Sequence, residues 1–195
     1  MKAVIGQKIQ YQVVFIGSYG VGKTTAVKAI SDTEVISMEA IAGMEEGADP
    51  GLIDAGKVTT TVGFDYGELG TADEDDLVSI YGIPGQARFE QVWDTLLPRC
   101  SGVVLWVFGN NKNYLQECGV WLETLKRKDS LRKLAVALTR IEDDDEESID
   151  SARELVVKYH PFAPVLTADP RDRDSVLQAV LMALSTPYPD LDEGV

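Results

Sequence analysis

The sequence is poor in the residues that build metal centres and disulfide frameworks. Among its 195 residues it contains two cysteines, Cys100 and Cys118, and a single histidine, His160. Their spacing matches no metal-ligand pattern, which argues against a structural zinc site. So few cysteines are typical of the reduced cytosol, and we therefore expect a cytoplasmic protein.

Long hydrophobic runs and lipid-attachment signals are missing as well. The best apolar run, residues 102–108, has the length of a strand, whereas a transmembrane helix needs roughly 20 residues. The chain starts with Met1 and Lys2, which is not a myristoylation signal, and no cysteine lies near its end for prenylation. We expect neither a transmembrane segment nor a direct lipid anchor, so recruitment to a membrane would depend on a partner.

Positive charge is also scarce. The 18 lysines and arginines face 32 aspartates and glutamates, which gives a net charge of −14. Nucleic acids and anionic membranes attract basic patches, so this balance argues against either of them as a direct partner. The simplest role of the excess charge is solubility.

What the sequence does contain is a regular alternation of apolar, strand-like runs with amphipathic helical segments. Such an alternation predicts an α/β fold, a doubly wound and mostly parallel six-stranded sheet with flanking helices and one antiparallel excursion. The expected strands are residues 10–16, 61–67, 77–81, 102–108, 133–138 and 163–166. The expected helices are residues 25–30, 89–97, 114–126, 149–159 and 174–184.

The chain has the length and the 45% hydrophobic content of a single folded domain. We place this domain at residues 1–188, followed by a flexible polar tail at residues 189–195. Residues 31–57 are rich in glycine, aspartate, glutamate and alanine and show weak periodicity. We expect this segment to be a mobile, partly helical connection.

Residues 17–24 read GSYGVGKT and match the phosphate-binding loop pattern G-x-x-x-x-G-K-[ST] at every required position. The glycines let backbone N–H groups face a phosphate chain, and the N-terminus of the following helix adds to the anion site. Lys23 is expected to reach the β- and γ-phosphates, and the Thr24 hydroxyl to ligate Mg²⁺. This phosphate loop therefore predicts nucleotide contacts from Gly17, Tyr19, Gly20, Val21, Gly22, Lys23, Thr24 and Thr25.

Two further segments extend the pattern: residues 61–64 read TVGF, and residues 82–86 read GIPGQ. With the phosphate loop they resemble the Ras-like small GTPases, and within them most of all the Arf-like proteins and the bacterial MglA-like GTPases that are encoded with roadblock-domain partners. The resemblance extends over about residues 8–186. It implies a small G domain of the P-loop NTPase class that binds GTP or GDP with Mg²⁺.

The resemblance assigns roles to residues in both segments. In switch I, Thr61 would close over Mg²⁺ and the γ-phosphate, although residues 59–61 could also be plain strand formers. In switch II, residues 82–86, the backbone N–H of Gly85 would bind the γ-phosphate. Gln86 would be the catalytic residue, because it would orient the attacking water.

The sequence departs from this family in the metal site. The family has D-x-x-G-Q in switch II, and its aspartate supports Mg²⁺, whereas Gly82 stands at that position here. Asp65 is a nearby carboxylate, but the resemblance places it in the strand between the two switches. We therefore do not expect Asp65 to serve the metal.

Further departures predict a slow reaction. Tyr19 stands where Ras proteins have glycine, and its ring would crowd the path of a partner's arginine finger. No arginine precedes Arg88, so switch I supplies no finger of its own. Arg88 could point at the phosphate or pair with surface acids. Because an arginine finger accounts for several orders of magnitude in rate, we expect slow intrinsic hydrolysis.

Base recognition is the least regular part of the pattern. Residues 139–142 read TRIE where the family has N-K-x-D, and residues 167–169 read TAD where it has S-A-K. Glu142 could accept the two guanine hydrogen bonds of the family's aspartate, or it could simply open the acidic run that follows. The Ala168 N–H would read guanine O6. The expected base contacts, with a relaxed guanine preference, are Thr139, Arg140, Glu142, Thr167 and Ala168.

These features favour a GTP-dependent molecular switch that hydrolyses GTP slowly and signals to protein regulators or effectors. The resemblance implies a roadblock-domain protein as the partner. A pseudo-GTPase scaffold with negligible hydrolysis is the alternative, because Tyr19, Gly82 and Thr139 all depart from the catalytic pattern. A metabolic phosphotransferase is disfavoured, because such enzymes carry lid arginines and this chain has few arginines.

Overall fold

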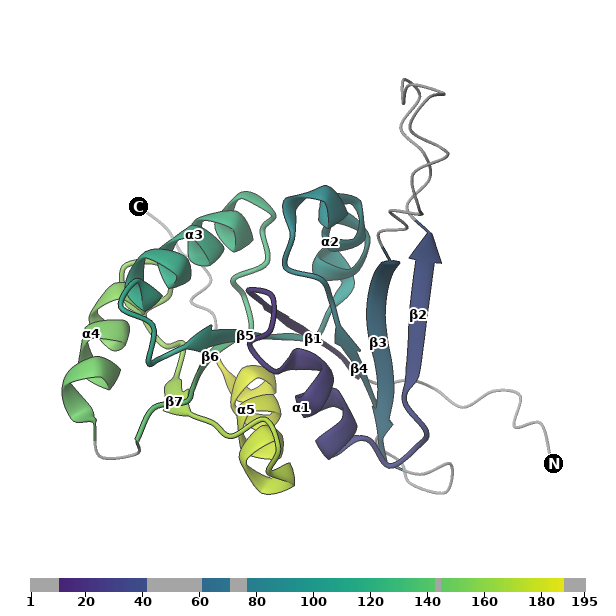
Figure 1. Ribbon diagram of the computed structural model, residues 1–195. Coiled ribbons are helices and arrows are strands. Elements are labelled where there is room, and N and C mark those ends of the chain that lie inside the picture. The colour runs from purple at the N-terminus through teal and green to yellow at the C-terminus, as the bar shows by residue number, and fades with distance from the viewer. Residues whose placement is uncertain (1–10, 42–60, 71–76, 143–144, 188–195) are drawn as a thin grey trace, which may run out of the picture.

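The computed structural model describes residues 11–41, 61–70, 77–142 and 145–187; the tail expected at residues 189–195 lies outside these ranges. The chain forms a seven-stranded sheet with the order β2-β3-β4-β1-β5-β6-β7, flanked by helices on both faces (Figure 1). Within the described ranges, no helix combines the length and the apolarity that crossing a membrane requires.

The strands and helices alternate along most of the chain. The strands are β1 Tyr11–Gly17, β2 Ile36–Ile41, β3 Thr61–Leu69, β4 Val78–Gly82, β5 Gly102–Phe108, β6 Leu134–Thr139 and β7 Val165–Thr167. The helices are α1 Lys23–Ile30, α2 Glu90–Leu96, α3 Tyr114–Arg127, α4 Glu146–Val156 and α5 Arg173–Ser185, and 3-10 turns at Ala87–Phe89 and Leu97–Arg99 flank α2.

The pairing confirms the predicted α/β class. Strands β4, β1, β5, β6 and β7 pair in parallel, whereas β2 and β4 each pair with β3 in antiparallel fashion. Right-handed crossovers through helices are the usual way to join parallel strands, which explains why helices cover both faces. The antiparallel excursion is strand β3, which lies between β2 and β4 near one edge of the sheet (Figure 1).

The strand count corrects the sequence prediction. Residues 31–57 were expected to be a mobile, partly helical connection, but strand β2, Ile36–Ile41, lies inside this segment and raises the count from six to seven. β2 is an edge strand with a single partner, so its sequence ISMEAI needs no strong apolar pattern. Residues 42–57 lie outside the described ranges.

Both faces of the central strands are buried, which explains their nearly continuous apolar sequences. In β1, Val13 and Phe15 pack in the core on the side of α1 and α5. Val14 and Ile16 pack in the core on the side of α2, α3 and α4. The sheet is thus held in place from both sides, and the carboxyl ends of its parallel strands form a fixed edge at which loops can build a site.

Candidate functional site

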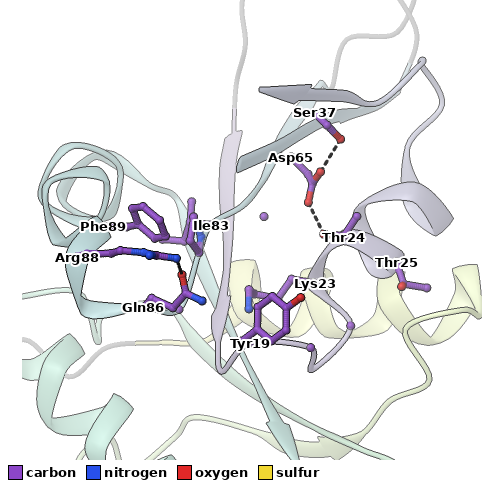
Figure 2. Close-up of a pocket in the computed structure, with 15 residues that line it drawn as sticks. Tyr19, Lys23, Thr24, Thr25, Ser37, Asp65, Ile83, Gln86, Arg88 and Phe89 are labelled. Atoms are coloured by element: carbon purple, nitrogen blue, oxygen red, sulfur yellow. Dashed lines mark hydrogen bonds between the residues drawn. The ribbon is translucent and has the colours of Figure 1, made fainter. Parts of the chain in front are cut away.

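The loops at the carboxyl edge of the sheet enclose two neighbouring pockets. The first, of about 510 Å³, is lined by phosphate-loop residues and by switch II (Figure 2). The second, of about 1120 Å³, lies where the loops after β6 and β7 face the phosphate loop. The two pockets share Gly20, Gly22 and Thr25, so one elongated ligand could occupy both.

The structure brings most of the predicted site residues to these pockets. Tyr19, Lys23, Thr24, Gly85 and Gln86 line the first. The second is lined by Val21, Arg140, Glu142, Thr167 and Ala168, among others.

Three phosphate-loop glycines have the positive φ angles that favour glycine, 143° at Gly17, 79° at Gly20 and 110° at Gly22. Gly17 is the most constrained, because a Cβ atom there would lie 2.2 Å from the backbone oxygen of Trp106. Helix α1 begins directly after Gly22 and has no side-chain cap at its N-terminus. The loop therefore presents an uncapped helix end to the pocket, as an anion site requires.

Lys23 folds back over the loop that precedes it. Its Nζ donates to the carbonyl oxygens of Gly17 and Ser18, both at 2.8 Å. Burial lowers the pKa of the Lys23 ammonium to about 8, and the negative charge of Asp65 opposes this shift. Lys23 is therefore a desolvated cation, and its ammonium loses its proton at a lower pH than that of an ordinary lysine.

Asp65 makes a contact that the sequence did not predict. It lies in the strand between the two switches, as expected, and the hydroxyl of Thr24 donates to its Oδ2 at 2.5 Å. The hydroxyl of Ser37 donates to the other carboxylate oxygen, Oδ1, at 2.7 Å. Figure 2 shows the three side chains in line across the pocket.

Strand register explains how Asp65 reaches the pocket. Ser37 on β2 pairs with Asp65 on β3, and Asp65 pairs with Gly82 on β4. Gly82, which stands where the family has its aspartate, lies directly beside this carboxylate: a Cβ atom there would be in van der Waals contact with Asp65 Oδ2, at 3.6 Å. The carboxylate thus comes from the strand beside the expected one. Counting cross-strand partners in the predicted hairpin was the signal that could have found it.

Switch II lies directly against the phosphate loop. A Cβ atom on Gly85 would come within 2.0 Å of the Gly17 carbonyl oxygen and 3.2 Å of the Trp121 ring. The indole nitrogen of Trp93, on α2, donates to the carbonyl oxygen of Pro84 at 2.8 Å. Two buried tryptophan side chains therefore contact this segment.

The side chain of Gln86 points to the pocket and has a defined neighbour. Arg88 Nη2 donates to Gln86 Oε1 at 2.7 Å (Figure 2). Tyr19 stands at the pocket mouth with 82% of its surface exposed. Thr61 is the first residue of β3, but the described part of the chain does not include its side chain, so its predicted metal role stays a prediction.

The base loops differ from the expected arrangement at Ala168. Its N–H donates to the carbonyl oxygen of Leu138 at 2.8 Å and so continues the β6–β7 ladder, which leaves it unable to read guanine O6 in this conformation. Thr139 is buried, and its hydroxyl donates to the Val107 carbonyl oxygen at 3.4 Å. Thr139 therefore has a structural role, because it joins the end of β6 to β5.

Arg140 also takes a position that the sequence did not predict. It adopts a positive φ of 56°, and its guanidinium carbon lies 4.7 Å from the centre of the Phe108 ring. Asp169, which lines the same pocket, is held by Arg171 at 2.7 Å, and this pairing lowers the pKa of Asp169 to about 2. Three other carboxylates that line this pocket, Glu142, Asp172 and Asp174, have no ion pair among the described residues.

No protein-family model matches the chain. A curated relative, ADP-ribosylation factor-like protein 3 of Saccharomyces cerevisiae, is 17% identical over 144 residues, or 74% of this chain. Two solved structures of S. thermophilus NFeoB mutants, bound to mGDP and to GDP, match 92% and 91% of this chain with TM-scores of 0.59 and 0.56 at 19% and 20% identity. These likenesses show the fold. The chain spans 65% of the Saccharomyces cerevisiae protein and 62% and 61% of the NFeoB chains, less than two thirds of each.

The glycine geometry of the phosphate loop gives a stability prediction. Gly17→Ala should destabilise the protein by about 2 kcal/mol, because the added methyl group meets a backbone oxygen at a positive φ. The melting temperature should fall by roughly 4–8 °C in a thermal unfolding experiment followed by circular dichroism. Gly82→Ala is the matched control, because its Cβ atom would meet nothing closer than a Val27 methyl at 3.1 Å. Equal shifts in both variants would contradict this account.

Proposed function

We propose that this chain is a guanine-nucleotide switch that binds GTP or GDP with Mg²⁺ and hydrolyses GTP slowly. The observation that carries the proposal is the contact between Asp65 and Thr24, which places a carboxylate beside the phosphate-loop hydroxyl in a pocket that also holds Lys23 and Gln86. The name of the Saccharomyces cerevisiae relative and the guanine nucleotides bound to the two NFeoB proteins support the choice of nucleotide.

The donor set fits Mg²⁺. A hydroxyl and a carboxylate are oxygen ligands of the kind that this ion prefers, and Thr24 and Asp65 would hold it. When bound, Mg²⁺ neutralises negative charge on the phosphate chain. This arrangement supports an active site over an inert scaffold, because Asp65 on the neighbouring strand would supply the carboxylate that Gly82 lacks.

The chain's own residues divide the remaining work. The loop N–H groups and the ammonium of Lys23 bind the phosphates. Gly85 would contribute its N–H to a γ-phosphate, and Gln86 would orient the attacking water. Among the described residues that line the first pocket, Arg88 is the one arginine, and it contacts Gln86. The lack of a second arginine there and the exposed Tyr19 ring at the mouth support a slow intrinsic rate.

Under the same proposal, the two switch segments would signal to partners which nucleotide is bound. Contacts of switch I and switch II with a γ-phosphate exist in one nucleotide state and are lost in the other, which is how such proteins expose a surface to partners. We propose protein regulators or effectors as these partners, with a roadblock-domain protein as the candidate that the sequence resemblance favours. The cytoplasm would be the setting, and a partner would supply any membrane recruitment.

Nucleotide specificity is tested by titrating the purified protein with fluorescent analogues of GTP, GDP and ATP, with Mg²⁺ and with EDTA. We expect the guanine nucleotides to bind more tightly than ATP, and Mg²⁺ to strengthen GTP binding. Single-turnover hydrolysis should be slower than about one per minute, and Gln86→Leu should slow it about tenfold or more. Equal affinity for ATP would remove the guanine assignment, and indifference to Gln86→Leu would favour the scaffold.

The Asp65 contact predicts a metal-specific defect. Asp65→Asn should weaken Mg²⁺-dependent GTP binding by about 10- to 100-fold, because the amide keeps the shape but lacks the charge that supports the ion. Affinity measured in EDTA should not fall. Ser37→Ala is the matched control, since it removes a hydrogen bond to the same carboxylate and leaves the charge in place.

A strand-swap variant sharpens this test. Asp65→Ser combined with Gly82→Asp moves the carboxylate to β4, at the position that pairs directly with residue 65. It should recover part of the Mg²⁺ dependence that Asp65→Ser alone loses. Unchanged Mg²⁺ dependence in Asp65→Asn would contradict the proposed metal site.

Lys23 predicts how nucleotide affinity depends on pH. The free protein holds Lys23 at a pKa of about 8, and bound phosphates favour the charged form, so binding takes up a proton as the pH rises above that value. Affinity is therefore full below about pH 8 and should fall roughly five- to tenfold between about pH 7.5 and pH 9. Lys23→Arg keeps its charge over this range, so its affinity should stay level whatever its absolute value. A level profile in the unmodified protein would overturn the role of Lys23.

A further inference from the structure

Arg88 is held in a defined place although its side chain is exposed. Its guanidinium carbon lies 4.7 Å from the centre of the Phe89 ring, and Nη2 donates to Gln86 Oε1 at 2.7 Å. Phe89 is itself buried in the protein, with 5% of its surface exposed, so it is a fixed platform. A cation over an aromatic ring is stabilised on that face, which reduces the freedom of the arginine.

The main chain fixes the other end of Gln86. The N–H of Phe89 donates to the Gln86 carbonyl oxygen at 2.9 Å, at the start of the 3-10 turn Ala87–Phe89. The backbone of Gln86 is thus bound by the residue that supports Arg88, and its side chain is bound by Arg88 itself. Together the two contacts restrain both ends of the glutamine.

Surface pairing does not account for the position of Arg88. The ion pairs found in the described part of the chain do not include Arg88. Of the two alternatives open from the sequence, a contact with phosphate or a pair with surface acids, the structure favours neither directly. It shows a contact with the candidate catalytic side chain instead.

The chemistry of this contact suits a positioning role. An amide oxygen has two lone pairs, so one can accept from Arg88 while the other remains for a water molecule. A hydrogen bond from a charged donor is stronger than a neutral one and polarises the amide, which makes its NH₂ group a better donor. Holding the Gln86 side chain in one rotamer also lowers the entropy cost of positioning it at each turnover.

We propose that Arg88 is a positioning residue that holds Gln86 oriented toward the attacking water. This inference rests on the proposed GTP hydrolysis and deepens it, because it assigns a role within the chain that a partner need not supply. Arg88 acts through Gln86 and makes no contact with the phosphate. Its removal should therefore slow hydrolysis and leave nucleotide affinity unchanged.

A double-mutant cycle on the full chain tests this role. Single-turnover hydrolysis of preloaded GTP is measured for the unmodified protein, Arg88→Ala, Gln86→Ala and the double variant, and affinity is measured with a fluorescent GDP analogue. We expect Arg88→Ala to slow hydrolysis about tenfold with affinity kept within about twofold. In the Gln86→Ala background the same change should have no further effect, because the two residues act as one unit.

A conservative variant separates positioning from folding. Arg88→Lys keeps one charged donor but loses the planar contact with Phe89, so it should recover part of the rate. Equal thermal stability in Arg88→Ala and the unmodified protein is expected, since the side chain is exposed.

Three results would overturn the assignment. An unchanged rate in Arg88→Ala would mean that the contact has no kinetic role, and a faster rate would mean that Arg88 restrains Gln86. An equal loss in the Gln86→Ala background would mean that Arg88 acts on the phosphate itself. Failure of the unmodified protein to bind guanine nucleotide, or hydrolysis that ignores Gln86→Ala, would instead overturn the proposed function on which the assignment rests.

Discussion

The hydrogen bond from Thr24 to Asp65 joins the two sides of the phosphate pocket. Thr24 stands in the first turn of α1, behind a loop whose path is fixed by glycines, and Asp65 stands on β3. The contact exists because Ser37, Asp65 and Gly82 occupy one lateral row of the sheet. A slip of one residue in either pairing would turn the carboxylate to the opposite face.

This placement separates two parts that one segment combines in the family that the sequence resembles. There, the metal-supporting aspartate and the catalytic glutamine both belong to switch II. Here the carboxylate moves with β3, whereas Gly85 and Gln86 move with the loop that follows β4. The proposed metal carboxylate and the proposed hydrolytic residue therefore lie on different elements of this chain.

The sequence was sufficient to predict the parallel core and the phosphate loop, because buried strands and a glycine-rich turn leave strong local patterns. It could not predict β2, because an edge strand paired on one side leaves no such pattern. It placed Asp65 correctly on a strand, but it did not predict the contact with Thr24, which follows from register between strands. The commitment of the Ala168 N–H to Leu138 depends on how far the β6–β7 ladder extends, which is again a property of the partner strand. The features that the sequence did not predict all depend on the pairing between strands.

Two of the three tryptophans of the chain have their indole rings against switch II. The Trp93 indole binds the Pro84 carbonyl oxygen, and the ring of Trp121 lies against Gly85, whereas the Trp106 ring packs on Phe15 in the core. Indole emission responds to hydrogen bonding and to local polarity, so two of the three natural fluorophores of this protein lie where a change in switch II would alter their surroundings. The molecule therefore carries optical reporters of switch II and needs no attached dye.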